Sequence, residues 1–311
     1  MNTTFIISGG AGRVVTSIPA LEKYHQLNPT DDFKVLVHGW HQLFWSHPLL
    51  QNRTYDANIK GTFEYHIKDN NVVIPEPYHL HSFFNQQKNM CMAFDEIINQ
   101  TNDHSDLSKP NLYTSHFEFN QTAQIFNEIK QNNPNKKIVV FQPFGSGCKL
   151  INNYPFDGSH RSLSPINYKK ISEAIKDIAV VIYASSRDVK ASDDTNIDIS
   201  NWNPYFRVMP GFIQQCDYFI GCDSVGQHVA RAFEKPGTVI MGATNDINFS
   251  YPDFFNVVRT DKKDPVYNPW RLSDADVDFI DRTNQDIMDF DDEEIDQIIH
   301  VIRSDLEKLN D

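Results

Sequence analysis

The 311-residue chain is short of the features that mark several large classes of protein. Its four cysteines are scattered without any Cys-x-x-Cys spacing, which argues against a zinc site or a disulfide framework. No apolar run approaches the roughly 18 residues that suggest a membrane helix, and the first residues lack the pattern of a secretory signal. We therefore expect no bound metal, no integral membrane segment and a reducing, cytoplasmic compartment.

Positive charge is also scarce. The chain carries 28 Lys and Arg against 41 Asp and Glu, a formal net charge of −13 at pH 7. A field of that sign repels phosphate backbones and anionic lipids, so we expect no nucleic-acid partner, although a local basic pocket for one small anion remains compatible with it. Aromatic residues are plentiful, with 22 Phe, 12 Tyr and 4 Trp, and they supply enough apolar area for a folded core.

Short apolar runs alternate with segments of helical spacing along most of the chain. Residues 4–8 form an apolar run that stops at glycines, and apolar side chains at helical spacing follow directly. Residues 33–38 provide a second apolar run, at a distance that suits a parallel crossover. Alternation of this kind predicts an α/β protein.

The best candidate for a domain boundary is the polar stretch 130–137, which contains a proline. A fresh apolar run begins at residue 138, and strands and helices then alternate again. We therefore expect two Rossmann-like domains, residues 1–133 and 134–311. Asp291 can cap a terminal helix with an apolar stripe, and this helix can pack back on the N-terminal domain.

The segment Gly9-Gly10-Ala11-Gly12-Arg13 opens the first expected helix. Glycines at positions 10 and 12 let the backbone approach a ligand closely, and free helix amides favour an anion or a polar group. The segment is not a full dinucleotide-binding motif, because Val15 occupies the position of the third glycine. A plain tight turn explains it equally well.

The stretch from 216 to 230 carries more information. An apolar run ends at Gly221, and Asp223-Ser224-Val225-Gly226 begins the next expected helix, which directs its amides toward the crevice at the carboxyl end of a parallel sheet. His228 lies about one turn further on and faces either the crevice or the sheet. Thr244 belongs to a small polar loop after the next strand, so two such loops side by side predict a ligand pocket.

These residues resemble glycosyltransferase family 9, the heptosyltransferase-like enzymes. The resemblance rests on Asp223, Ser224, Gly226 and His228, followed by an alanine-rich helix, Pro236 and Gly242. Residues 12–21 are similar to the family's first loop and helix, and residues 141–146 to its loop after the first strand of the C-terminal domain.

The resemblance implies a GT-B fold, in which two Rossmann-like domains face a cleft. It implies transfer of a sugar from a nucleotide-sugar donor, bound by the C-terminal domain, to a glycan or lipid-linked acceptor on the N-terminal side, without a metal or another cofactor. Gly10 and Gly12 would belong to the acceptor-side loop. The implied donor-binding residues are Gly145, Ser146, Lys149, Arg161, Asp223, Ser224, Gly226, His228 and Thr244. Among these, Arg161 is the nearest match to the family's phosphate-contacting Lys, and Lys149 competes with it.

One departure concerns catalysis. The family's presumed base is an Asp in the first loop, where this chain has Arg13, and a guanidinium cannot accept a proton at neutral pH. Either another acid serves, or Arg13 binds phosphate or acceptor, or the activity is altered or lost. If the base has moved, His38 after the second strand is the first candidate and His41 the reserve. Two alternatives stay open: an inactive homologue that binds nucleotide sugars, and a nucleotide-sugar epimerase or hydrolase on the same scaffold.

Overall fold

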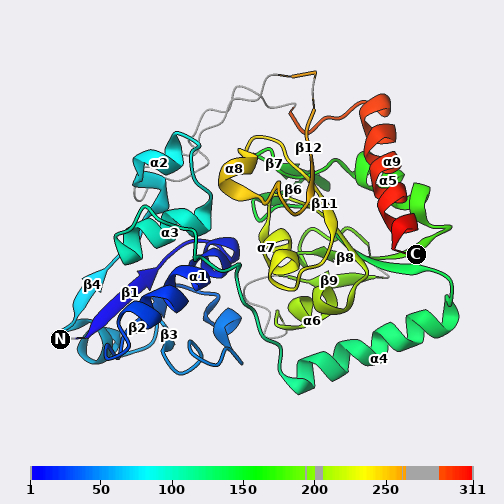
Figure 1. Cartoon of the computed structure of the whole chain (residues 1–311). Helices are drawn as coiled ribbons and strands as arrows, with labels where there is room; N and C mark the ends of the chain where they lie inside the picture. Colours follow the sequence, from blue (N-terminus) through cyan, green and yellow to red (C-terminus); the bar gives the residue numbers. More distant parts are fainter. Residues whose placement is uncertain (1, 193–194, 200–205, 261, 264–286, 310–311) are drawn as a thin grey trace. The chain divides into compact units, whose positions relative to one another are not determined.

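The computed structural model describes residues 2–192, 195–199, 206–260, 262–263 and 287–309. The chain divides into two compact units, Met1–Ser115 and His116–Asp311. Each unit contains a parallel sheet with helices packed on it (Figure 1), so the α/β class expected from the sequence is confirmed.

The first unit is built on a four-stranded parallel sheet in the order β3-β2-β1-β4. Its strands are β1 (Thr3–Ile7), β2 (Lys34–Val37), β3 (Thr54–Asp56) and β4 (Asn71–Val73). Its helices are α1 (Ala11–Leu27), α2 (His81–Phe84) and α3 (Met90–Asn99), with short helical turns η1 (His41–Phe44), η2 (Phe63–Ile67) and η3 (Pro77–His79). Helices α1 and α3 pack against each other (Figure 1).

The second unit contains a six-stranded parallel sheet in the order β12-β11-β10-β5-β8-β9, and a separate hairpin. The sheet strands are β5 (Lys137–Gln142), β8 (Ala179–Ser185), β9 (Asn196–Asp198), β10 (Tyr218–Cys222), β11 (Gly237–Ile240) and β12 (Asn256–Val258). The hairpin joins β6 (Cys148–Ile151) to β7 (Tyr154–Asp157). The helices are α4 (His116–Asn132), α5 (Pro165–Ile175), α6 (Val208–Gln215), α7 (Val225–Ala232), α8 (Asp246–Phe249) and α9 (Asp292–Lys308).

The central strands read as apolar runs because helices cover both faces of such a sheet. Every residue of β10 is buried, and so is every residue of β11. At Gly237 a Cβ would lie 3.1 Å from the backbone carbon of Phe219, so glycine permits the close pairing of these two strands. The strand order β11-β10-β5 places the loops that follow these strands side by side.

The division between the units falls one helix earlier than the 133/134 boundary expected from the sequence. Helix α4 packs against α6, so it belongs to the second unit. Arg207, which precedes α6, forms a buried ion pair with Glu118 of α4 at 2.8 Å. Gly211 of α6 lies so close to Thr122 that a Cβ there would sit 3.0 Å from its side chain. The polar stretch 130–137 therefore connects two elements of one unit.

The terminal helix α9 is part of the core of the second unit, whereas the sequence left open that it packs on the first. Asp291 and Glu294 form the expected capping box at its start. Its apolar stripe is buried in the same core as residues of α5, beside which it runs (Figure 1). The buried stripe consists of Ile295, Ile298, Ile302 and Leu306.

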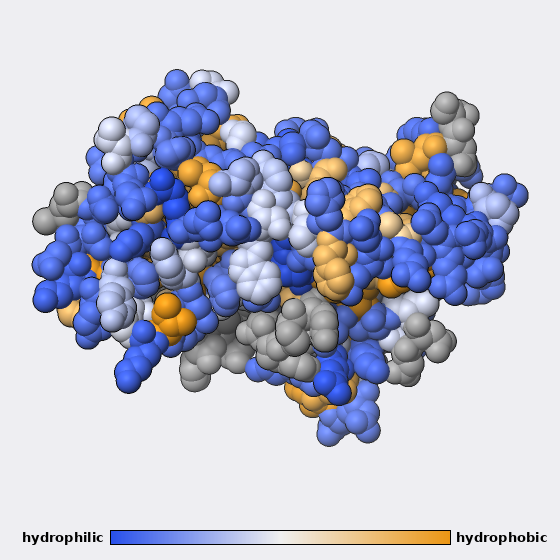
Figure 2. Space-filling view, turned by 90° about the horizontal axis from the view of Figure 1, so that it is seen from below, coloured by the Kyte–Doolittle hydropathy of each residue, from blue (hydrophilic) through white to orange (hydrophobic). Residues whose placement is uncertain are grey.

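The surface matches the polar composition. Figure 2 shows a face dominated by hydrophilic side chains, with apolar ones in small separate patches. Within the part of the chain that the structure describes, none of the helices combines the length and the apolar character that a bilayer crossing requires.

Candidate functional site

The candidate site of the second unit lies at the carboxyl edge of its sheet. Strands β11, β10 and β5 are consecutive neighbours and run parallel, so the loops that follow them leave the same edge side by side. These loops contain Gly145 and Ser146 after β5, Asp223 and Ser224 after β10, and Thr244 after β11. Crevices at such edges are the usual ligand sites of open α/β sheets.

Gln142, at the end of β5, holds the start of α7. Its side chain is buried, and Nε2 donates a hydrogen bond to Ser224 Oγ at 2.8 Å. Its Oε1 accepts a hydrogen bond from the Gly226 amide at 2.8 Å. A Cβ at position 226 would overlap Gln142 Oε1, so glycine is required there. Gln142 was not predicted from the sequence, where its only signal is a polar residue at the end of an apolar run.

Arg161 links two of these loops. Its Nε donates to Ser159 Oγ, after β7, at 2.9 Å, and its Nη2 donates to Ser146 Oγ, after β5, at 3.3 Å. Its Nη1 reaches the Asp223 carbonyl oxygen at 3.4 Å and lies 3.6 Å from the Asp223 carboxylate. The structure therefore brings Arg161, Ser146 and Asp223 together, as a shared binding site requires.

Asp157, at the end of β7, organises the loop beneath Arg161. Burial opposes ionisation of this carboxyl, but the Arg161 charge and hydrogen bonds from Ser159 and Ser162 outweigh it and hold the pKa below its ordinary value. Ser162 Oγ donates to Asp157 at 2.5 Å. A Cβ at Gly147 would lie 2.8 Å from Asp157 Oδ1, so glycine lets the loop close over the carboxylate. Asp157 was not predicted from the sequence.

The other expected donor-site residues fall in different environments. Lys149 is exposed on strand β6 of the hairpin. His228 is only 6% exposed, its Nδ1 is hydrogen-bonded to the Tyr251 hydroxyl at 3.0 Å, and burial lowers its pKa to about 4, so it is neutral at pH 7. The Thr244 Oγ1 is buried and lacks a hydrogen-bond partner among the described residues, so it remains available to a ligand.

The glycine loop of the first unit opens α1 as expected. Gly10 is the N-cap residue, and α1 receives no hydrogen bond from a capping side chain. Gly9 has φ +96°, a conformation that favours glycine, and a Cβ there would lie 2.8 Å from Arg13 Cδ. Gly12 and Arg13 are the second and third residues of the helix. The first helix amides and the Arg13 side chain therefore belong to the same short segment.

Arg13 is held inside the first unit. Its side chain is nine-tenths buried, and Nη1 forms an ion pair with Glu76 Oε2 at 3.2 Å. Its Nη2 donates to the Pro75 carbonyl oxygen at 3.4 Å. The guanidinium carbon lies 5.2 Å from the Tyr78 ring centroid and 5.8 Å from that of Phe94. Glu76, which the sequence analysis did not consider, follows β4 and therefore lies at the same sheet edge as the glycine loop.

The two candidate histidines lie near β2. His38 directly follows the strand and is exposed, with its amide bonded to the Ile7 carbonyl oxygen at 3.3 Å. His41 begins η1, and its Nδ1 lies 3.8 Å from Asp56 Oδ2, longer than a hydrogen bond. Its ring contacts Trp45 edge-on at 6.0 Å. The structure therefore places His41 near a carboxylate but beyond hydrogen-bond distance, and leaves His38 exposed to solvent.

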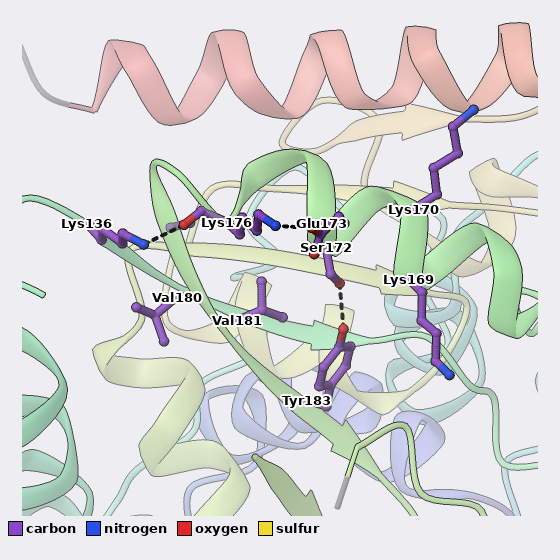
Figure 3. A pocket seen from close by; sticks show the side chains of 10 residues that line it. Lys136, Lys169, Lys170, Ser172, Glu173, Lys176, Val180, Val181 and Tyr183 are labelled. Atoms are coloured by element: carbon purple, nitrogen blue, oxygen red, sulfur yellow. Dashed lines mark hydrogen bonds and ion pairs between the residues drawn. The ribbon is translucent and has the colours of Figure 1, made fainter. Parts of the chain in front are cut away.

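A separate pocket lies beside α5 and β8 (Figure 3). Its lining contains Lys136, Lys169, Lys170, Ser172, Glu173, Lys176, Ala179, Val180, Val181 and Tyr183. Several of its polar groups are engaged with each other: Lys176 pairs with Glu173, and the Tyr183 hydroxyl donates to Ser172 at 2.7 Å. None of the expected donor-site residues lines this pocket. The described residues also contain no group of three His, Cys, Asp or Glu side chains that could hold a metal ion.

No protein-family model matches the sequence, and no curated protein does. Solved structures do match. A glycosyltransferase family 9 protein from Veillonella parvula is 10% identical, with 83% of this chain and 84% of that chain aligned and a TM-score of 0.61. The E. coli ADP-heptose LPS heptosyltransferase II is 14% identical, with 97% and 100% aligned and a TM-score of 0.60. The dodecameric glycosyltransferase TibC from E. coli H10407 is 11% identical, with 98% and 76% aligned and a TM-score of 0.63.

Identities this low establish the fold alone. The α/β fold with two parallel-sheet units is therefore confirmed as the one that heptosyltransferases share, in line with the GT-B fold that the sequence resemblance implied. Activity has to be argued from the residues of the site.

Proposed function

We propose that the chain is a glycosyltransferase that moves a sugar from a nucleotide-sugar donor to a hydroxyl group of a glycan or lipid-linked acceptor. The observation that carries this proposal is the position of Arg161, whose guanidinium contacts the loops after both β5 and β10 at the start of α7. A cation beside the first amides of a helix suits a diphosphate, because both neutralise its charge.

The leaving group explains why these residues matter. In a direct displacement, the acceptor oxygen bonds to the anomeric carbon while the bond from that carbon to the diphosphate breaks, and the diphosphate leaves with the electron pair. Arg161 and the first amides of α7 would stabilise the charge that develops there. The hydroxyls of Ser146 and Thr244 add donors on either side. In this proposal these groups neutralise the leaving diphosphate in the place of a metal ion.

The acceptor belongs to the first unit in this proposal. Gly10 and Gly12 leave the first amides of α1 accessible to a polar group, and no side chain caps them. Among the structures that share the fold, TibC was solved in complex with ADP-D-β-D-heptose. That compound is therefore the first donor to try. We also propose a cytoplasmic location, in keeping with four cysteines that form no disulfide.

Arg13 favours a second candidate function. An arginine stands where the resembled family has its carboxylate, and an inactive protein that binds nucleotide sugars would need no base. These two candidates differ in one measurable property: the transferase releases nucleoside diphosphate from the bound donor, and the inactive binding protein does not.

Isothermal titration with ADP-, UDP- and GDP-sugars, and with the bare nucleotides, tests the proposal. We expect at least one nucleotide sugar to bind, and Asp223→Ala and Ser224→Ala to weaken its binding at least tenfold. Ser172→Ala is the matched control, because it also removes one hydroxyl group but does so on α5, outside the candidate site. It should leave the affinity for the nucleotide sugar unchanged. Failure of every nucleotide sugar to bind, or equal affinity in all variants, would reject the assigned site.

A further inference from the structure

A carboxylate does lie at the first glycine loop, but a different strand supplies it. Strands β1 and β4 are parallel neighbours, so the loops that follow them leave the same edge of the sheet. The loop after β1 leads to Arg13, and the loop after β4 carries Glu76. Glu76 Oε2 lies 3.2 Å from Arg13 Nη1, and the Arg13 side chain in turn rests against Gly9.

We infer that Glu76 is the general base that accepts the proton of the acceptor hydroxyl. This inference rests on the proposed transferase function and adds a catalytic residue to it. As the acceptor oxygen bonds to the anomeric carbon and the diphosphate departs, the hydroxyl proton moves to a carboxylate oxygen of Glu76. The resulting carboxylic acid then returns the proton to water.

The Glu76 carboxylate has room for this role. Its side chain is 28% exposed, so a hydroxyl group from solvent can reach it. Oε1 accepts a hydrogen bond from the Tyr78 amide at 3.2 Å, and Oε2 faces Arg13. An ionised carboxylate offers about four lone-pair sites, so these two contacts leave acceptor capacity for a substrate hydroxyl.

Arg13 acts as the positioning residue for Glu76. Its guanidinium is nine-tenths buried, and a buried cation strongly favours a fixed carboxylate beside it. Tyr78 and Phe94 restrict the guanidinium from their ring faces. The Arg13 Nε is buried and lacks a hydrogen-bond partner among the described residues, next to Gly9. The arginine that removes the expected base from the loop thus holds a replacement at the same loop.

The other titratable groups at this edge fit the role less well. His38 is exposed, and His41 lies near Asp56 at the end of β3, on the far side of β2 from the glycine loop. Glu76 alone among these candidates is joined by a side-chain contact to the loop that opens α1.

Release of nucleoside diphosphate from ADP-D-β-D-heptose, or from the tightest-binding nucleotide sugar, tests the inference with water as acceptor. Glu76→Gln keeps an oxygen for the Tyr78 amide but cannot take a proton. We expect it to lower turnover by about 10²- to 10⁴-fold, the usual contribution of a general base, and to change donor affinity less than twofold. Glu76→Asp, which retains a carboxylate, should lose far less.

Glu96→Gln is the matched control, because Glu96 is also a partly buried carboxylate paired with a cation, Lys88, at 2.5 Å in the same unit. It should leave turnover within twofold of the wild type. Turnover by Glu76→Gln within threefold of wild type overturns the inference, and so does a wild-type protein that binds donor but releases no nucleotide. A wild type that binds no nucleotide sugar instead rejects the proposed function itself, so the two failures are distinguishable.

Discussion

Gln142 and Ser224 are joined by a hydrogen bond of 2.8 Å that ties the end of β5 to the start of α7. The Oε1 atom of Gln142 accepts a hydrogen bond from the Gly226 backbone amide, so one buried side chain fixes the loops after two neighbouring strands. Ser224 is the N-cap residue of α7 but its side chain does not cap the helix. The position of its hydroxyl is therefore set by Gln142 and not by its own helix.

Replacing this amide should affect both folding and binding. Gln142→Leu leaves the Gly226 amide and the Ser224 hydroxyl without their partner, which we expect to cost about 1–3 kcal/mol of unfolding free energy. Urea unfolding measures this loss, and titration with a nucleotide sugar should show weaker binding. Gln142→Glu, whose oxygens can still accept from both groups, should recover part of the stability. Equal stability of Gln142→Leu and the wild type would contradict the bridging role.

Gly226→Ala should be destabilising even though alanine favours helices. Alanine gains about 1 kcal/mol over glycine in a helix interior. The new Cβ, however, would overlap Gln142 Oε1 and lie 2.8 Å from the Phe219 ring, and overpacking of this kind costs typically 1–3 kcal/mol. Thermal unfolding should therefore show a lower Tm. Gly10→Ala is the control, because a Cβ there meets nothing within 4 Å, and it should change Tm much less.

The elements could be predicted from the sequence more completely than the contacts of the site. Buried parallel strands read directly as apolar runs, as in residues 138–141, and glycines mark the loops that follow them. Glu76 and Gln142 were missed because their partners lie 63 and 82 residues away in the chain. Only the order of the strands, with β4 beside β1 and β5 beside β10, brings such residues together, and no local spacing encodes that order.

Arg161→Ala should weaken nucleotide-sugar binding more than Lys149→Ala. Arg161 contacts the loops after β5 and β10, whereas Lys149 is exposed on the hairpin. Loss of a hydrogen bond to a charged group costs about 1.5–3 kcal/mol, which corresponds to roughly 10- to 150-fold in Kd. Isothermal titration of both variants gives the ranking directly. A larger loss in Lys149→Ala would transfer the phosphate-binding role to that residue.

Two further variants separate the possible bases. His38→Ala should leave turnover within twofold of the wild type, because the exposed imidazole has no role if Glu76 takes the proton. Arg13→Asp should lower both Tm and turnover, since it places a second carboxylate beside Glu76 and removes its cation. Nucleotide release and thermal unfolding provide the readouts. Loss of turnover in His38→Ala would support His38 as the base instead. A gain of turnover in Arg13→Asp would indicate that the natural protein has given up catalysis and binds nucleotide sugars only.

His228 should make the protein less stable as the pH falls below about 6.5. Burial lowers the pKa of this histidine to about 4, against an ordinary value of 6.5, so the unfolded chain takes up a proton that the folded protein excludes. The contribution of His228 to the free energy of unfolding is therefore fully present above pH 6.5. It declines as the pH falls toward 4, by on the order of 3 kcal/mol in total.

Urea unfolding at pH 7.5 and at pH 5 measures the dependence on His228. In His228→Asn the difference between the two pH values should shrink, because asparagine does not titrate but still offers a hydrogen-bonding group near the position of Nδ1. Tyr251→Phe is the control: it removes the 3.0 Å hydrogen bond to His228 without removing the imidazole, so it should lower stability at both pH values and preserve the difference. An unchanged difference in His228→Asn would show that the imidazole is already protonated, or already exposed, in the folded protein at pH 5.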